Sequence, residues 1–208
     1  MNDFIINNCS NSLNDNFSNS VLKSSNSFEF HTNQNYYNKT PLVNLVSLSD
    51  HLGLKNIFVK DESNRFGLNS FKVLGSTYAI HEILKNNPNI KVFCTATDGN
   101  HGKGLAWAAQ KFSKKAIVFV PRDTSKNRIK AIQLYDAIVY QLDLNYEETC
   151  VYASKKCDEN GWQLVQDASW ENYEEIPSLI MSGYLTHFKE IEFPNNKNSK
   201  SKFDIIFL

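Results

Sequence analysis

The sequence predicts an α/β fold in which a mostly parallel sheet lies between two layers of helices, a three-layer αβα arrangement. From about residue 40 onward, short apolar runs of β-favouring residues alternate with longer helical patterns. This alternation is typical of parallel strands joined by crossover helices. At Val92–Ala96 one such run breaks into a glycine-rich turn followed at once by a helical pattern. The chain contains no internal repeat.

Each predicted helix places apolar residues at spacings of three and four, and each predicted strand is a short apolar run between turn residues. The strands are expected at Asn56–Lys60, Val92–Ala96, Ala116–Val120, Ala137–Gln141, Gln163–Val165 and Phe203–Leu208. The helices are expected at Lys72–Leu84, Asn100–Phe112, Lys126–Tyr135, Tyr146–Glu159 and Ile176–Ile191. We expect Asp123 or Thr124 to cap the third helix, Asn145 to cap the fourth, and Asn160-Gly161 to end the fourth.

The first 39 residues differ from the rest of the chain because they are rich in Asn and Ser and have no sustained apolar period. Such a segment buries too little apolar surface to offset the entropy lost on ordering, so residues 1–39 are expected to form a disordered tail. The alternative is that Phe28 and Phe30 dock part of this segment against the folded chain as an arm. Order is expected to begin near Thr40.

Composition argues against nucleic-acid and membrane partners. Lys plus Arg and Asp plus Glu both number 22, and the formal net charge is 0, so no excess of basic residues favours nucleic acid. No apolar run is long enough to span a bilayer, and the N-terminus lacks a secretory signal pattern. The 4 cysteines are scattered, which favours a reducing, cytoplasmic compartment over a disulfide framework. Small zwitterionic molecules fit as partners.

Lys72 lies where a turn containing Gly67 runs into a helical pattern. Phe71, Val73 and Leu74 flank it, and an amine partly removed from water favours the neutral form that attacks an aldehyde. The pattern therefore predicts a lysine that forms a Schiff base. Considered alone, Lys72 could also be an ordinary surface lysine at the start of a helix.

The stretch Thr95–Gly104 contains the glycine-rich turn. A helix that starts directly after such a turn leaves backbone N–H groups unpaired, and these bind anions. Neither G-x-G-x-x-G nor the Walker spacing is present, so the carboxylate of a small substrate fits better than a nucleotide phosphate. Asp98 would stay ionised beside the helix start and could accept a proton. The alternative for Asp98 is an ordinary N-cap.

Together the two stretches resemble fold-type II pyridoxal-phosphate enzymes, the group that includes threonine dehydratase and cysteine synthase. Ser70-Phe71-Lys72 with Leu74-Gly75 resembles the lysine motif of that group, and Gly99-Asn100-His101-Gly102 resembles its loop for the substrate carboxylate and the cofactor ring. Three segments resemble the diaminopropionate ammonia-lyase family in particular, namely Asp61–Lys72, Thr97–Ala109 and Val165–Tyr173, the last followed by Ile176-Pro177.

The resemblance implies a role for each matching residue. Lys72 would hold pyridoxal 5'-phosphate as a Schiff base, Phe71 would pack beside the cofactor ring, and Asn100 would hydrogen-bond its 3-hydroxyl group. The loop for the substrate carboxylate would consist of Thr97, Gly99, Asn100 and His101.

The resemblance also implies the bases that remove the α-proton. Asp98 would act on the D-isomer and Asp167 on the L-isomer, with Lys72 as a competing base, and β-elimination would yield pyruvate and ammonia. From the residues alone, Asp167 could equally be a turn residue after a strand. His101 is expected to cap or pack its helix, because no second ligand stands at a spacing that would predict a metal site.

The resemblance covers about Thr40 to Leu208, which corresponds to the front half of a longer, two-domain enzyme expected to be a homodimer. Residues 40–83 and 192–208 would belong to an incomplete large domain and residues 84–191 to a smaller α/β domain. The strand expected at Phe203–Leu208 ends where the group's glycine-rich phosphate loop would begin, so a truncated chain is expected.

The function that the resemblance implies is a pyridoxal-phosphate-dependent ammonia-lyase acting on 2,3-diaminopropionate. Two alternatives stay open, a threonine or serine dehydratase of the same fold, and a non-catalytic fragment of the lyase.

Overall fold

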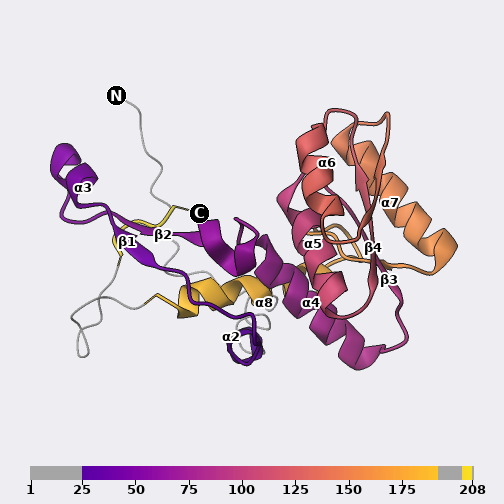
Figure 1. The fold of residues 1–208 in the computed structure, drawn as a ribbon, viewed down its shortest axis with the longest axis horizontal. Helices are drawn as coiled ribbons and strands as arrows, with labels where there is room; N and C mark the ends of the chain where they lie inside the picture. The colour runs from indigo at the N-terminus through magenta and orange to yellow at the C-terminus, as the bar shows by residue number, and fades with distance from the viewer. Residues whose placement is uncertain (1–24, 192–202, 208) are drawn as a thin grey trace.

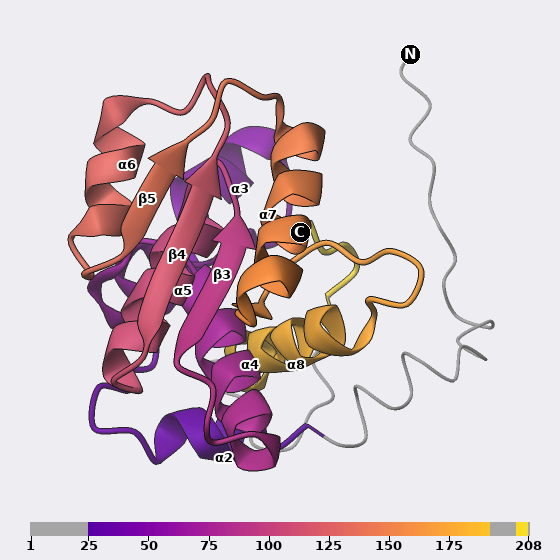
Figure 2. The same cartoon turned by 90° about the vertical axis from the view of Figure 1, so that its right-hand side faces the viewer.

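The computed structural model describes residues 25–191 and 203–207. Strands β3, β4 and β5 lie between helices α5 and α6 on one face and helix α7 on the other (Figure 1, Figure 2). The predicted three-layer α/β class is therefore confirmed. The elements in chain order are α2 (Ser27–Thr32), β1 (Leu42–Asn44), α3 (Val46–Leu52), β2 (Phe58–Lys60), the 3-10 helix η1 (Glu62–Gly67), α4 (Lys72–Asn86), β3 (Val92–Ala96), α5 (Asn100–Lys111), β4 (Lys115–Val120), α6 (Lys126–Gln133), β5 (Ile138–Gln141), α7 (Tyr146–Asn160), β6 (Gln163–Leu164) and α8 (Glu175–Lys189).

The larger sheet has the strand order β5-β4-β3-β6, and all neighbouring strands are parallel. Successive side chains of a strand point to opposite faces. Phe93 and Val118 accordingly belong to one buried cluster with residues of α5 and α6, whereas Cys94 and Phe119 belong to a second cluster with residues of α7. Because both faces are covered, the strands are continuous apolar runs. The strands predicted between residues 92 and 165 accordingly match the observed bounds to within one residue.

Strands β1 and β2 pair antiparallel in a separate two-stranded sheet, which lies with α3 at one end of the molecule (Figure 1). The sequence did not predict β1 or α3. Apolar side chains of this unit, among them Val46, Leu52 and Val59, are exposed. With so little of α3 and β1 buried, neither shows the periodic apolar pattern on which the prediction relied.

The expectation of a disordered tail up to residue 39 is wrong for its described part, residues 25–39. Helix α2 lies against α4 and α8. Its His31 is fully buried, with Nδ1 2.6 Å from Thr186 Oγ1 and Nε2 3.0 Å from Thr77 Oγ1. Phe30 also stacks on the ring of His81, with centroids 4.3 Å apart, so the docked-arm alternative is confirmed. Hydrogen bonds between polar side chains hold much of this segment in place. The prediction of disorder relied on the scarcity of apolar residues and could not detect such bonds. Residues 1–24 lie outside the described residues.

Two further expectations about chain segments are wrong. Residues 203–207 form no strand, because no described strand pairs with them and an isolated strand leaves its backbone groups unpaired; Leu208 lies outside the described residues. Helix α6 is capped by Ser125, whose side chain accepts from the Arg128 N–H, and not by Asp123 or Thr124. The predicted cap of α7 is confirmed, as Asn145 forms a capping box with Glu148, and so is its end at Gly161.

Two glycines let α5 and α8 lie close to the beginning of α4. A Cβ atom at Gly104 of α5 would lie 3.1 Å from both the Cα and the N of Val73, and one at Gly183 of α8 would overlap the Leu74 carbonyl group. A side chain at Gly183 would therefore collide with the backbone of α4, and one at Gly104 would require that backbone to shift slightly. Three helices therefore meet around the first turns of α4, the helix that begins at Lys72.

A buried ion-pair network joins η1 to the C-terminal end of α8. The Arg65 guanidinium donates to Glu190 through Nη1 and Nη2, at 2.7 Å each, and to Glu62 through Nε, also at 2.7 Å. Lys60 Nζ lies 2.6 Å from Glu190. The side chains of Arg65 and Glu190 are fully buried, and each is paired, as a charge removed from water must be. The network fixes the chain just before the turn that leads to Lys72.

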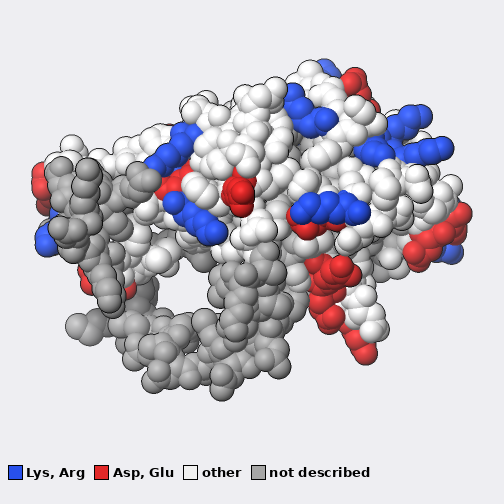
Figure 3. All heavy atoms as spheres, turned by 90° about the horizontal axis from the view of Figure 1, so that it is seen from below, with Lys and Arg blue, Asp and Glu red and all other residues white. Residues whose placement is uncertain are grey.

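On the face seen in Figure 3, basic and acidic side chains are interspersed over the described residues, in keeping with the balanced charge of the sequence. None of the helices in residues 25–191 combines the length and the apolar composition needed to cross a bilayer. The division into a large and a smaller domain stays a prediction.

Candidate active site

Lys72 is the first residue of α4, and the turn before it has an unusual backbone. Phe66, Gly67 and Asn69 all have positive φ angles, of 48°, 77° and 59°. Non-glycine residues rarely adopt this conformation, and it persists only where the surroundings enforce it. Ser70 Oγ accepts a hydrogen bond from the Lys72 N–H at 3.3 Å. The turn therefore fixes the backbone position of Lys72.

The amine of Lys72 forms an ion pair with Asp167. Lys72 Nζ lies 2.8 Å from Asp167 Oδ2, and the two side chains are 31% and 16% exposed. The amine also lies 5.7 Å from the ring centroid of Phe71 and 5.6 Å from that of Tyr184. The lysine is thus half-buried beside aromatic rings and one carboxylate, and it can still be reached from solvent.

Asp167 follows strand β6, at the carboxyl end of the sheet, where open α/β sheets bind their ligands. Burial raises the pKa of the Asp167 carboxyl, but positive charge at His101 and the hydrogen bond and charge of Lys72 outweigh burial, and the pKa lies below its ordinary value. Burial lowers the pKa of His101 against the opposing effect of Asp167. A buried imidazole of lowered pKa is neutral near pH 7. Near that pH the charge on His101 is therefore absent, and the ion pair with Lys72 remains to favour the ionised carboxylate.

The turn Thr97–Asn100 between β3 and α5 has the shape of an anion site. Thr97 Oγ1 accepts from the N–H groups of Gly99 at 3.0 Å and Gly102 at 3.4 Å. The N–H groups of Asn100 and His101 have no hydrogen-bond acceptor among the described residues. The Asn100 side chain is exposed and likewise makes no hydrogen bond within that part of the chain. These donors are available to a carboxylate or to a hydroxyl group of a ring.

Asp98 lies at the outer edge of the turn, just before the start of α5. Its side chain is 69% exposed, and Oδ2 lies 3.5 Å from Nη1 of Arg128, at the start of α6. No hydrogen bond or ion pair joins Asp98 to Lys72 within the described residues. The structure therefore brings Asp167 and His101 to the lysine, and it leaves Asp98 at the rim of the turn.

Sequence reasoning missed two residues, one beside Lys72 and one that contacts the turn before it. Tyr184 comes from α8, and nothing in the sequence links it to a motif more than a hundred positions away. Lys103 lies inside the glycine-rich motif, and its Nζ donates to the Leu68 carbonyl at 2.5 Å, which joins α5 to the strained turn. The presence of a second lysine within the motif could have indicated that Lys103 contacts the site.

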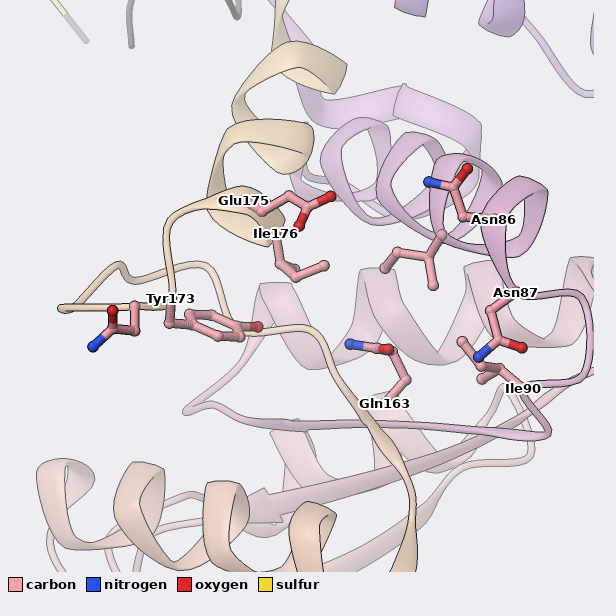
Figure 4. A pocket seen from close by; sticks show the side chains of 9 residues that line it. Asn86, Asn87, Ile90, Gln163, Tyr173, Glu175 and Ile176 are labelled. Atoms are coloured by element: carbon pink, nitrogen blue, oxygen red, sulfur yellow. The ribbon is translucent and has the colours of Figure 1, made fainter.

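A separate pocket of about 350 Å³ is lined in part by Asn172 and Tyr173, which follow Asp167 in the chain. Figure 4 shows it between the end of α4, strand β6 and the beginning of α8. Polar and apolar side chains line it in similar measure, and Asn86 and Asn87 lie across the pocket from Tyr173. It does not include Lys72. Within the described residues, no group of three or more His, Cys, Asp or Glu side chains is placed to hold a metal ion.

Comparison with known proteins gives consistent matches. The family model described as "Pyridoxal-phosphate dependent enzyme" matches residues 34–208. The diaminopropionate ammonia-lyase of Salmonella typhimurium (strain LT2) is 44% identical over 76% of this chain and 44% of its own length. The catabolic L-threonine dehydratase of Staphylococcus aureus (strain USA300) is 29% identical over 62% of this chain and 37% of its own.

Among solved structures, the crystal structure of diaminopropionate ammonia lyase from Escherichia coli in complex with an aminoacrylate-PLP azomethine reaction intermediate matches with a TM-score of 0.79. The two chains are 40% identical, and the match covers 84% of this chain and 48% of that chain. This chain thus spans about half the length of the relatives that it matches.

Proposed function

Because the chain belongs to the family of pyridoxal-phosphate-dependent enzymes, we propose that it carries the reactive lysine and the bases of an ammonia-lyase acting on 2,3-diaminopropionate. The observation that carries this proposal is the pair formed by Lys72 and Asp167, an accessible amine 2.8 Å from a carboxylate at the carboxyl end of the sheet. The similarity to diaminopropionate ammonia-lyases supports the choice of substrate over threonine.

The residues present fit the cofactor. Lys72 would hold pyridoxal 5'-phosphate through its amine, whose neighbours Phe71 and Tyr184 offer aromatic surface beside it. The exposed amide of Asn100 is available to the ring hydroxyl. When bound, pyridoxal phosphate supplies a conjugated ring that accepts the electron pair left as the Cα–H bond breaks.

The chain's own residues would bind the substrate and move its proton. The unpaired N–H groups of Asn100 and His101 would hold the substrate carboxylate, in a turn whose shape Thr97 and Gly99 maintain. Asp167 Oδ2 would take the α-proton of the L-isomer once the amine of Lys72 is engaged elsewhere. A base must be ionised to accept a proton, and before Lys72 is engaged the lowered pKa of Asp167 keeps the carboxylate in this form.

Asp98 would act on the D-isomer, as its match to the lyase motif implies. Its exposed carboxylate at the rim of the turn lies on a different element from Asp167. Two bases on separate loops are what removal of a proton from two mirror-image substrates requires. A homodimer and a cytoplasmic location also stay predictions; size-exclusion chromatography with light scattering tests the first.

The test uses the chain in a hybrid with the part of the Salmonella enzyme that lies outside the matched region, so that the assay contains a full-length lyase. We expect pyruvate release from 2,3-diaminopropionate, and loss of this release in the Lys72→Ala hybrid. Strong activity on L-threonine or L-serine together with none on 2,3-diaminopropionate would refute the substrate assignment and favour the dehydratase, as would full retention of activity after Asp98→Ser.

The chain by itself tests the alternative of a non-catalytic fragment. An absorption band that appears with pyridoxal 5'-phosphate and is absent after Lys72→Ala would show that this chain engages the cofactor. No band in either the chain or the hybrid would favour the fragment.

A further inference from the structure

The proton on His101 has a defined position. His101 is buried near the start of α5, and its Nε2 lies 2.8 Å from the carbonyl oxygen of Val165. A carbonyl oxygen only accepts hydrogen bonds, so Nε2 must carry a proton. In a neutral imidazole the other nitrogen, Nδ1, is then left with a lone pair.

That lone pair faces the carboxylate of Asp167. Nδ1 is buried and has no hydrogen-bond partner among the described residues, and Asp167 Oδ2 lies 3.7 Å from it. A lone pair and an ionised oxygen repel each other at this distance, and leaving a buried acceptor unpaired costs about 1 to 3 kcal/mol. A proton on Oδ2, with the two atoms drawn from 3.7 Å to hydrogen-bond distance, removes both penalties.

Asp167 Oδ2 lies between two groups that suit different protonation states. On one side the ammonium of Lys72, at 2.8 Å, favours the ionised carboxylate. On the other side His101 Nδ1 favours a carboxyl group that can donate. When Lys72 is engaged with the cofactor, the ammonium is lost from this position and the second influence remains.

We propose that His101 is a positioning residue that makes Asp167 a better proton acceptor, by receiving a hydrogen bond from Oδ2 once Asp167 has taken the substrate's α-proton. This inference rests on the proposed function. The Cα–H bond breaks, its electron pair stays with the substrate carbon and its conjugated system, and the proton forms an O–H bond at Oδ2 that is shared with Nδ1. No further reactant is needed.

Several other titratable groups act on Asp167, and they come from other elements. The phenols among them have pKa values raised by burial, and burial also raises the pKa of the Cys150 thiol. They remain neutral near pH 7 and do not replace His101 as the acceptor. These groups are Lys72 of α4, Tyr146 and Cys150 of α7, Tyr173 after β6, and Tyr184 of α8.

Nitrogen NMR of the histidine rings in the isolated chain tests the geometry without any activity. We expect the neutral Nε2–H tautomer for His101 near pH 7. In Asp167→Asn, the new amide N–H can donate to Nδ1, so the Nδ1 resonance should move as a lone pair does when it accepts a hydrogen bond. An Nδ1–H tautomer, or a Nδ1 resonance unmoved by Asp167→Asn, overturns the proposal.

Two variants and two substrates test the role in the hybrid enzyme. The amide of His101→Gln reaches the Nε2 position and can still donate to Val165, but it lacks the acceptor toward Asp167. We expect kcat for the L-isomer to fall about 10- to 100-fold with little change in KM, consistent with the size of acid–base effects. The rate with the D-isomer, which uses Asp98, should change less than 3-fold.

Equal losses with both isomers would show a merely structural role, and unchanged kcat for the L-isomer would show none; either result overturns the proposal. Partial recovery of the L-isomer rate in His101→Asn, whose amide oxygen can reach the Nδ1 position, supports it. If the unmodified hybrid is inactive, the proposed function fails, while the tautomer measurement still decides this inference.

Discussion

His31 should make the stability of this protein fall as the pH drops below 6.5. Burial, and next to it the charge on Arg65, lower the pKa of His31 from 6.5 to about 3. A histidine with a lowered pKa in the folded state binds its proton mainly when unfolded. Above pH 6.5 the ring is neutral in both states, so His31 does not lower the free energy of unfolding. As the pH falls from 6.5 toward 3, the unfolded state binds the proton and the native state loses stability.

The size of this effect follows from the pKa difference. Each pH unit within the window corresponds to about 1.4 kcal/mol, so the contribution of His31 between pH 7 and pH 5 is about 2 kcal/mol. The variant His31→Gln retains a polar group that can reach the Thr77 and Thr186 hydroxyls but cannot titrate. We expect it to be less stable than the wild type at pH 7 and to lose about 2 kcal/mol less than the wild type between pH 7 and pH 5.

Urea unfolding followed by circular dichroism, at pH 7, 6 and 5, measures both quantities. His51→Gln is the matched control, since His51 is exposed on α3, and its pH dependence should equal that of the wild type. The reasoning is refuted if His31→Gln and the wild type lose the same free energy of unfolding over this range.

Two further substitutions test the packing around α4. Gly183→Ala gains about 1 kcal/mol of helix propensity, but the added methyl group overlaps the Leu74 carbonyl, so we expect a net loss of about 1 to 3 kcal/mol of stability by urea unfolding; an equal or higher stability would contradict the close approach. Glu190→Gln leaves the buried Arg65 with fewer charged partners and should cost about 3 kcal/mol at pH 7. Salt bridges with Arg65 and Lys60 outweigh burial and lower the pKa of Glu190 to about 2. The stability that ionised Glu190 contributes is therefore present above pH 4.5 and is lost as the pH falls through 2. If the stability difference between the wild type and Glu190→Gln does not shrink as the pH falls below 4.5, this assignment is contradicted.

The parts of the fold that the sequence predicted are those decided by local pattern. Strand β3 lies at its predicted residues, because a run buried on both faces is apolar throughout. Asn145 caps α7 as predicted, because a capping box needs only residues three positions apart. The same local logic predicted the turn at Thr97, with N–H groups left free at the start of α5.

What the sequence did not predict depends on partners far along the chain. Helix α2 is held by the bonds of His31 to residues 46 and 155 positions away, and a composition rich in Asn and Ser gives no sign of them. The pairing of Lys72 with Asp167 spans 95 positions. Motif resemblance indicated that both residues matter, but only the packing of α4 against α5 and α8 shows that Asp167, and not Asp98, contacts the amine.

The close crossing of α4 and α8 at Gly183 has a consequence for how the site can open. Backbones in direct contact cannot slide past one another without collision. We therefore expect α4 and α8 to move as one unit, which keeps Lys72 and Tyr184 at a fixed separation. A rearrangement around Lys72 is therefore expected in the segments that carry Thr97–Asn100 and Asp167, and not between α4 and α8.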